Sequence, residues 1–142
     1  MLPQIWGKYG WNFIHLITVS YPINPTKDDK INYFNYFYWL QKVLPCEKCR
    51  YNMLQHLQKY PLSDTVLSCK ENLIKWGIDL HNAVNYSNGK PILSYYEAIE
   101  NIENLMKEKS KDGAIHNYFY LIIIGLIIVI LILIFVILGK KN

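Results

Sequence analysis

Two cysteines separated by two residues are the part of this sequence best suited to chemistry. The stretch VLPCEKCRYN, residues 43–52, places Cys46 and Cys49 behind a proline, in a chain of 142 residues with only three cysteines. At a helix N-terminus, unpaired backbone N–H groups and the helix dipole stabilise a thiolate and lower its pKa from about 8.5. Such a pair can exchange disulfides, with Cys46 as the exposed thiol and Cys49, almost one turn further on, facing the interior.

Three interpretations of this pair compete. A zinc site needs four ligands, and the remaining candidates, Cys69, His56 and His81, form no second closely spaced pair. Two packed core cysteines are the simplest alternative. The third is a redox pair embedded in helices, which needs an electron acceptor; a thioredoxin-like arrangement is disfavoured because no βαβ pattern is present.

Rings and ring-binding groups recur elsewhere at helical spacing. Trp11 and His15 share one face of a predicted helix, and His81 and Asn85 share a face of another, with Asn82 alongside. Taken singly, a tryptophan or histidine on a helix is more often a packed core residue. Together with a helical C-x-x-C pair, the two faces indicate a site for one planar ligand.

Helices are predicted almost throughout the first part of the chain. Apolar spacing and terminating prolines or glycines place them at residues 3–20, 28–44, 46–60, 66–86 and 94–109. The last of these opens on a capping box made by Ser94 and Glu97. No strand pattern is convincing. We therefore expect an all-α fold, an up-and-down four-helix bundle with a short fifth helix.

A different kind of segment follows. Residues 118–138, YFYLIIIGLIIVILILIFVIL, contain no charged residue, and at about 1.5 Å per residue they span a hydrocarbon core of about 30 Å. We expect a C-terminal transmembrane helix that anchors a domain of residues 1–110 through a linker at 111–117. Lysines lie on both sides of the segment, so the positive-inside rule gives only a small preference for a cytosolic domain.

The charge pattern argues against nucleic acid as a partner. The formal charge is +4, and two of the contributing lysines, Lys140 and Lys141, follow the apolar segment. The domain itself is therefore close to neutral and shows no basic stripe of the kind that binds phosphate backbones.

Several short motifs follow one another in a fixed order. They are WNFIH at 11–15, YP at 21–22, LPCEKC at 44–49, WGIDLHNAVN at 76–85 and GKP at 89–91. In this order and spacing, over roughly residues 6–96, the chain resembles the Erv/ALR family of FAD-linked sulfhydryl oxidases.

The resemblance implies a homodimeric four-helix bundle with a short fifth helix that binds FAD non-covalently at one end, and no metal. Cys49 then lies next to the flavin ring, while Cys46 takes electrons from the substrate. The positions that match the flavin site, or are expected to lie beside it, are Gly7, Trp11, His15, Tyr21, Cys49, Tyr51, His81, Asn82, Val84, Asn85 and Lys90.

The implied activity is oxidation of protein thiols. Electrons pass through Cys46 and Cys49 to FAD and then to O2, giving hydrogen peroxide. Short, membrane-tied members resemble those of large cytoplasmic DNA viruses, which oxidise virion membrane proteins through a thioredoxin-like carrier. We therefore expect such a carrier or a virion protein as the partner, at a host or virion membrane, with the domain in the cytosol.

Departures from the family pattern matter too. Cellular members often carry a further structural disulfide, and Ile78 and Tyr95 stand where its cysteines would fall. A shuttle C-x-x-C arm is also missing, so substrate thiols are expected to reach Cys46 directly or from the other subunit. Cys69 is interpreted as a buried apolar residue, with an auxiliary thiol as the alternative. The rival function is a tail-anchored helical interaction protein whose C-x-x-C binds zinc or is not catalytic.

Overall fold

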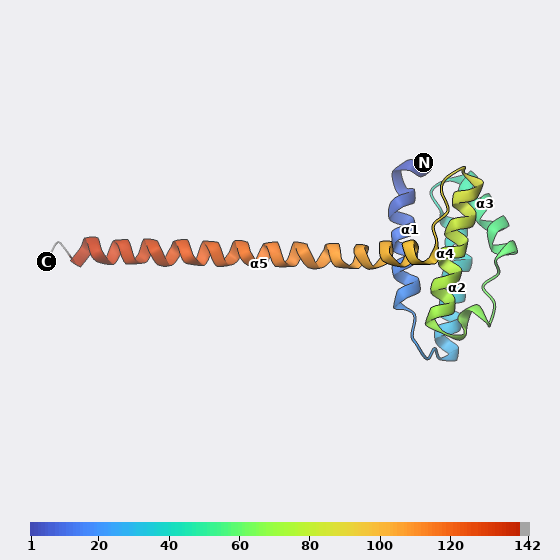
Figure 1. Cartoon of the computed structure of the whole chain (residues 1–142), viewed down its shortest axis with the longest axis horizontal. Coiled ribbons are helices and arrows are strands. Elements are labelled where there is room, and N and C mark those ends of the chain that lie inside the picture. Colours follow the sequence, from blue (N-terminus) through green and yellow to red (C-terminus); the bar gives the residue numbers. More distant parts are fainter. Residues whose placement is uncertain (140–142) are drawn as a thin grey trace. The chain divides into compact units, whose positions relative to one another are not determined.

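The computed structural model describes residues 1–139, and the side chains of 1–107 and 118–131 among them. Its elements are α1 (Pro3–Ser20), α2 (Lys27–Val43), α3 (Glu47–Lys59), the 3-10 turn η1 (Val66–Ser68), α4 (Lys70–Ser87) and α5 (Tyr95–Gly139) (Figure 1). Residues 1–139 contain no strand, so the all-α prediction is confirmed. The chain divides into two compact units, Met1–Ile102 and Glu103–Asn142.

Local signals set most of the helix ends. The α2 helix begins at a capping box in which Thr26 and Asp29 bond reciprocally. The predicted capping box of α5 is also present, because Glu97 accepts from the backbone and hydroxyl of Ser94 while Ser94 Oγ accepts from the Glu97 N–H. The α2 helix stops before Pro45, whose ring disfavours helical geometry in the preceding residue.

Two predicted boundaries are wrong. The fourth helix does not start near residue 66: η1 comes first, and α4 begins at Lys70 with Cys69 as its N-cap. The fifth helix was expected to be short and to end near Lys109, but α5 continues through Gly139. No proline interrupts residues 95–139, and a single glycine inside a helix costs only about 1 kcal/mol, so the helix is not forced to stop.

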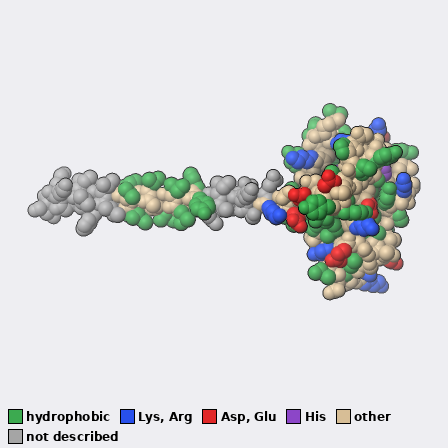
Figure 2. All heavy atoms as spheres, in the orientation of Figure 1, with side chains coloured by type: hydrophobic (Ala, Val, Ile, Leu, Met, Phe, Trp, Pro, Cys, Tyr) green, Lys and Arg blue, Asp and Glu red, His purple; other side chains and the backbone are tan. Residues whose placement is uncertain are grey.

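The predicted membrane segment is only partly within the described residues. No helix among the described residues offers an apolar stretch long enough to cross a membrane. Hydrophobic side chains do cover residues 118–131 (Figure 2). The side chains of the rest of the predicted segment, 132–138, and of the predicted linker at 111–117 lie outside the described set.

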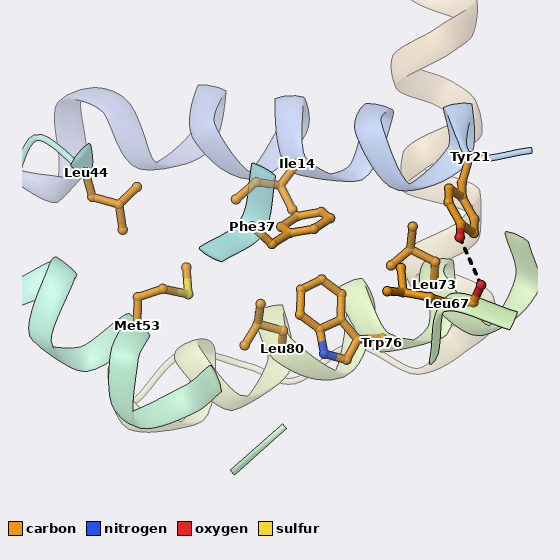
Figure 3. Close-up of a cluster of buried hydrophobic side chains, with 9 residues drawn as sticks. All are labelled: Ile14, Tyr21, Phe37, Leu44, Met53, Leu67, Leu73, Trp76 and Leu80. Atoms are coloured by element: carbon orange, nitrogen blue, oxygen red, sulfur yellow. Dashed lines mark hydrogen bonds between the residues drawn. The ribbon is translucent and has the colours of Figure 1, made fainter. Parts of the chain in front are cut away.

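The core of the first unit joins all four bundle helices. Its buried members are Ile14, Tyr21, Phe37, Leu44, Met53, Leu67, Leu73, Trp76 and Leu80 (Figure 3). Phe37 meets Trp76 edge to face, with ring centroids 4.8 Å apart, and the Trp76 indole N–H donates to the carbonyl of Tyr60. These contacts connect α2, α4 and the end of α3, which fixes the frame around the cysteine pair.

A second cluster packs the first turns of α5 against α4. Ile78 is buried with Ala98 and Ile102, and the hydroxyl of Tyr95 donates to Asp79. Ile78 and Tyr95 are the two positions at which the family resemblance leads one to expect the further disulfide of cellular members. Here apolar packing and a hydrogen bond connect the same two helices.

Charges of both signs are scattered over the visible face of the first unit (Figure 2). This distribution agrees with the near-neutral balance of the sequence.

Candidate functional site

The elbow between α2 and α3, residues 44–46, ends at Cys46, and Cys49 lies in the first turn of α3. Cys46 is the N-cap of α3, and its Sγ accepts the backbone N–H of Cys49 at 3.2 Å. The two cysteines form a disulfide, with Cα atoms 5.0 Å apart. Both side chains are half-buried, so the bond is reachable from solvent while Cys49 packs against the main core. The disulfide therefore lies at a helix N-terminus, as the redox interpretation of the pair requires.

The elbow is held by two hydrogen-bonded cations. The Arg50 guanidinium donates to the carbonyl of Leu44 at 2.6 Å, and the ammonium of Met1 donates to the carbonyl of Pro45 at 3.1 Å. Positive charge near a thiolate stabilises it. The elbow therefore favours the deprotonated form of a reduced cysteine pair.

A close helix contact brings the predicted ring-binding residues together. A Cβ on Gly77 of α4 would lie 3.0 Å from the Thr18 methyl of α1, so the two helices approach as closely as a glycine permits. One turn away, His15 Nε2 and His81 Nδ1 lie 2.9 Å apart in a hydrogen bond. Trp11 stacks on His81 with ring centroids 4.1 Å apart and planes 6° from parallel. This set, Trp11, His15 and His81, is the ring cluster.

Burial keeps both histidines uncharged. It lowers the pKa of His15 from 6.5 to about 4. For His81, burial together with the charges of His15 and Lys90 lowers the pKa to about 4. Near neutral pH the ring cluster therefore consists of two neutral imidazoles, one of which donates to the other.

The ring cluster has properties that fit a planar, hydrogen-bonding cofactor such as FAD. The His15 Nδ1 is buried and has no hydrogen-bond partner among the described residues, which is costly unless a ligand supplies one. One turn before Trp11, a Cβ on Gly7 would meet no atom within 4 Å, so the surface there is open. Trp11 and Cys49 both pack against the main core, which links the rings to the disulfide through one cluster.

The end of α4 supplies polar groups beyond the ring cluster. Gly89 takes a φ of 65°, which a glycine adopts without strain, and the turn lets the Lys90 N–H donate to the carbonyl of Asn85 at 2.9 Å. Lys90 is exposed, yet its charge acts on His81. Val84 and Asn85 are half-buried on the same turn. Lys90 is therefore placed to meet an anionic group near the rings.

Asn82 has a different use in this structure. Its amide donates to the Leu93 carbonyl at 2.8 Å and accepts the Leu93 N–H at 3.0 Å. These bonds attach the loop that follows α4 to the helix itself. Asn82 thus positions the loop that carries Lys90.

Two predicted residues are not brought to the ring cluster. Tyr21 is fully buried in the core, its hydroxyl donates to the Leu67 carbonyl at 2.9 Å, and Figure 3 places it at the opposite end of the core from Leu44. Tyr51 is 65% exposed on α3 and makes no ring contact with a described residue. Both tyrosines were expected near the flavin only from the family resemblance, which does not show what each hydroxyl bonds.

Trp6, one turn before Gly10, was not among the predicted site residues. Its indole Nε1 is buried without a hydrogen-bond partner among the described residues, and its ring lies 3.0 Å from where a Gly10 Cβ would be. Like Trp11, it packs against the core of the first unit.

A metal centre is not supported by the described residues. No three His, Cys, Asp or Glu side chains among them converge on one point, and Cys46 and Cys49 are bonded to each other. Cys69, half-buried at the N-cap of α4, is the free cysteine of the described residues.

Comparisons with known proteins agree with this arrangement. The model of the Erv1 / Alr family matches residues 8–109. A protein named "probable FAD-linked sulfhydryl oxidase" in Acanthamoeba polyphaga mimivirus is 52% identical over 121 residues, 85% of this chain and 83% of the relative. A "putative FAD-linked sulfhydryl oxidase" of Invertebrate iridescent virus 6 is 34% identical over 64% of this chain and 86% of the relative.

A solved structure shares the fold. The FAD-binding domain of Erv1 from Saccharomyces cerevisiae aligns with a TM-score of 0.66 at 21% identity, covering 73% of this chain and 96% of that domain. The family model covers most of the chain, including the cysteine pair and the ring cluster. The chain therefore belongs to the Erv1 / Alr family.

Proposed function

We propose that this protein is an FAD-dependent thiol oxidase that forms disulfides in protein substrates. The observation that carries the proposal is the Cys46–Cys49 disulfide at the N-terminus of α3. Relatives at 52% and 34% identity are named as FAD-linked sulfhydryl oxidases, which supports the same activity. FAD, when bound, supplies a two-electron acceptor that passes electrons on to O2.

The cysteines perform the exchange with substrate. A substrate thiolate attacks Sγ of Cys46, a new S–S bond forms, and Cys49 leaves as a thiolate. A second substrate thiolate then attacks the substrate sulfur of the mixed disulfide, and Cys46 leaves as a thiolate. The Cys49 N–H, already 3.2 Å from Sγ of Cys46, stabilises that leaving group. The substrate has lost two electrons, and they reside on the reduced cysteine pair.

Other residues hold the cofactor. Trp11 and His81 offer flat faces, His15 Nδ1 offers a buried hydrogen-bonding atom, and Lys90 offers a positive charge for a phosphate. Because both imidazoles are neutral, they bind the ring system without placing a buried charge against it. Cys49, packed on the same core as Trp11, is the cysteine on the cofactor side of the disulfide.

The test uses purified full-length protein. We expect a yellow protein with flavin absorbance near about 450 nm and oxygen uptake on addition of a dithiol. Cys49→Ala should keep the flavin and lose thiol-dependent oxygen uptake. The matched control is Cys69→Ala, which removes the free cysteine and should keep both. A colourless protein containing stoichiometric zinc, or full turnover in Cys49→Ala, contradicts the proposal.

The cellular setting is proposed on sequence grounds. The uncharged run at 118–138 supports a C-terminal membrane anchor, with the domain on the cytosolic side of a host or virion membrane. Viral relatives support a viral disulfide-forming pathway whose substrate is a thioredoxin-like carrier or a virion protein. Alkaline extraction of membranes from expressing cells tests the anchor: release of the full-length chain into the soluble fraction rejects it.

The assembly is proposed to be a homodimer. Exposed apolar side chains of α1, namely Ile5, Tyr9 and Phe13, recur at i, i+4 and form a stripe that a second copy can cover. Light scattering of the detergent-solubilised chain measures this directly. A monomeric mass at micromolar concentration rejects the dimer.

A further inference from the structure

The Arg50 side chain bonds to the elbow that carries Cys46. Its guanidinium Nη1 donates to the Leu44 carbonyl at 2.6 Å. This bond is short, as expected when the donor is charged. The backbone N–H of Arg50 donates to the Cys46 carbonyl at 3.0 Å, which is the ordinary bond of the first turn of α3 and does not depend on the side chain at position 50. The side chain therefore connects the first turn of α3 to Leu44, the residue that follows α2.

We propose that Arg50 is a positioning residue that keeps Cys46 at the N-cap of α3 and so promotes its release as a thiolate. The inference rests on the proposed disulfide exchange, because it assigns Arg50 to the step in which Cys46 leaves the substrate.

The geometry of Cys46 explains why the hydrogen bond from Arg50 to Leu44 matters. Cys46 has an extended backbone, with φ −128° and ψ 121°, the conformation typical of an N-cap, and in it Sγ accepts the Cys49 N–H. The residues just before Cys46, 44 and 45, are not helical, so the regular backbone hydrogen bonds of a helix do not fix them. The Arg50 bond to Leu44 supplies that fixation and keeps the sulfur at the positive end of the helix.

The charge of Arg50 adds to the effect. Arg50 is half-buried, and no carboxylate pairs with it among the described residues, where the only ion pair is Lys107 with Glu103. Its positive charge at the elbow is therefore not neutralised by a partner. A positive charge favours the ionised form of a thiol, so this charge acts in the same direction as the N-cap position.

Other charged groups lie near the elbow and must be held constant. The Met1 ammonium donates to the elbow itself, Glu47 and Lys48 are exposed on the first turn of α3, and Lys42 lies over the Tyr38 ring at the end of α2. All of them are unchanged when only Arg50 is replaced. A difference between variants then reports on Arg50.

The test isolates the Cys46 thiol in the full-length chain. Cys49→Ala with Cys69→Ala leaves Cys46 as the single cysteine, and the rate of alkylation by iodoacetamide against pH gives its thiolate pKa. In this background Arg50→Met should raise that pKa by about one unit, a tenfold loss of alkylation rate below it. Arg50→Lys should recover part of the loss, since it keeps the charge and one donor.

Lys59→Met is the matched control, because it removes one cation from the same helix about 14 Å further along its axis. It should leave the thiolate pKa unchanged. With both active cysteines restored, Arg50→Met should also make the pair less oxidising by a factor of ten in its equilibrium with a dithiol, about 30 mV.

Two results overturn the inference: an unchanged Cys46 pKa in Arg50→Met, or an equal shift in Lys59→Met. Where Arg50→Met fails to fold, Arg50→Leu, which likewise lacks both the donor and the charge, takes its place, and an unchanged pKa there is equally decisive. Oxygen uptake by the unmodified protein distinguishes a failure of the Arg50 proposal from a failure of the proposed oxidase function. Uptake with an unchanged Cys46 pKa rejects only the role of Arg50, while absence of uptake rejects the oxidase.

Discussion

Acidification should unfold the first unit through the two histidines of the ring cluster. His15 and His81 each have a pKa of about 4 in the fold, against an ordinary value of 6.5. Between these values the unfolded chain binds protons that the folded chain does not. The stabilisation is therefore complete above pH 6.5 and is lost as the pH falls toward 4.

The size of the loss follows from these two values. For one such histidine the free energy of unfolding falls by about 2 kcal/mol between pH 7.5 and pH 5. Two independent histidines would give about 4 kcal/mol, but His15 and His81 share a hydrogen bond and titrate as a pair. We expect a total between about 2 and 4 kcal/mol, a large part of the stability of a small domain.

The assay is urea unfolding followed by tryptophan fluorescence, with FAD at one fixed saturating concentration. The chain has four tryptophans, and all of them lie within Met1–Ile102, so the signal reports the first unit alone. His15→Gln and His81→Gln should each remove about half or more of the pH dependence. His56→Gln is the control: the pKa of His56 is lowered by burial and by Lys59, but to a smaller extent, so its replacement should change the dependence less. An unchanged slope in both cluster variants refutes the reasoning.

Three substitutions test the hydrogen bonds that position the site. Tyr21→Phe should lower the free energy of unfolding by about 1–3 kcal/mol, because the buried Leu67 carbonyl loses its donor, and should leave FAD affinity nearly unchanged by fluorescence titration. Asn82→Ala frees the backbone of Leu93; it should weaken FAD binding while hydrogen exchange of that loop increases, and equal exchange contradicts the assignment. Thr26→Ala removes a helix cap and should cost about 1 kcal/mol in urea unfolding with full oxidase activity, whereas lost activity would place this cap in the mechanism.

The features that the sequence predicts well are those encoded by neighbours in the chain. The Ser94 and Glu97 cap requires only residues three apart, and Pro45 with the C-x-x-C spacing is enough to place Cys46 at a helix start. The end of α5 was mispredicted because no local breaker marks it. A lysine-rich stretch is compatible with either a linker or a continued helix.

Contacts between distant residues needed the structure. The sequence identified His15 and His81 separately, but their hydrogen bond joins residues 66 apart and depends on the close approach of α1 and α4 at Gly77. Tyr21 carries a motif position and the right chemistry, yet its hydroxyl is used by a carbonyl in the core. A polar atom is available to a ligand only where no other protein group already forms a hydrogen bond to it. The residue type alone does not reveal these partners.

The disulfide elbow and the ring cluster both favour a working pH near neutral. At the elbow, the N-cap position and the nearby cations favour the thiolate form of a reduced Cys46, so we expect exchange below the ordinary thiol pKa of about 8.5. At the ring cluster, burial requires neutral imidazoles, and stability is lost once the pH falls below 6.5. Lowering the thiolate pKa much further would therefore gain little, because the domain that holds the flavin loses stability over the same acidic range. The two sites together favour a working range near neutral pH, the range in which Cys46 is reactive and His15 and His81 are uncharged.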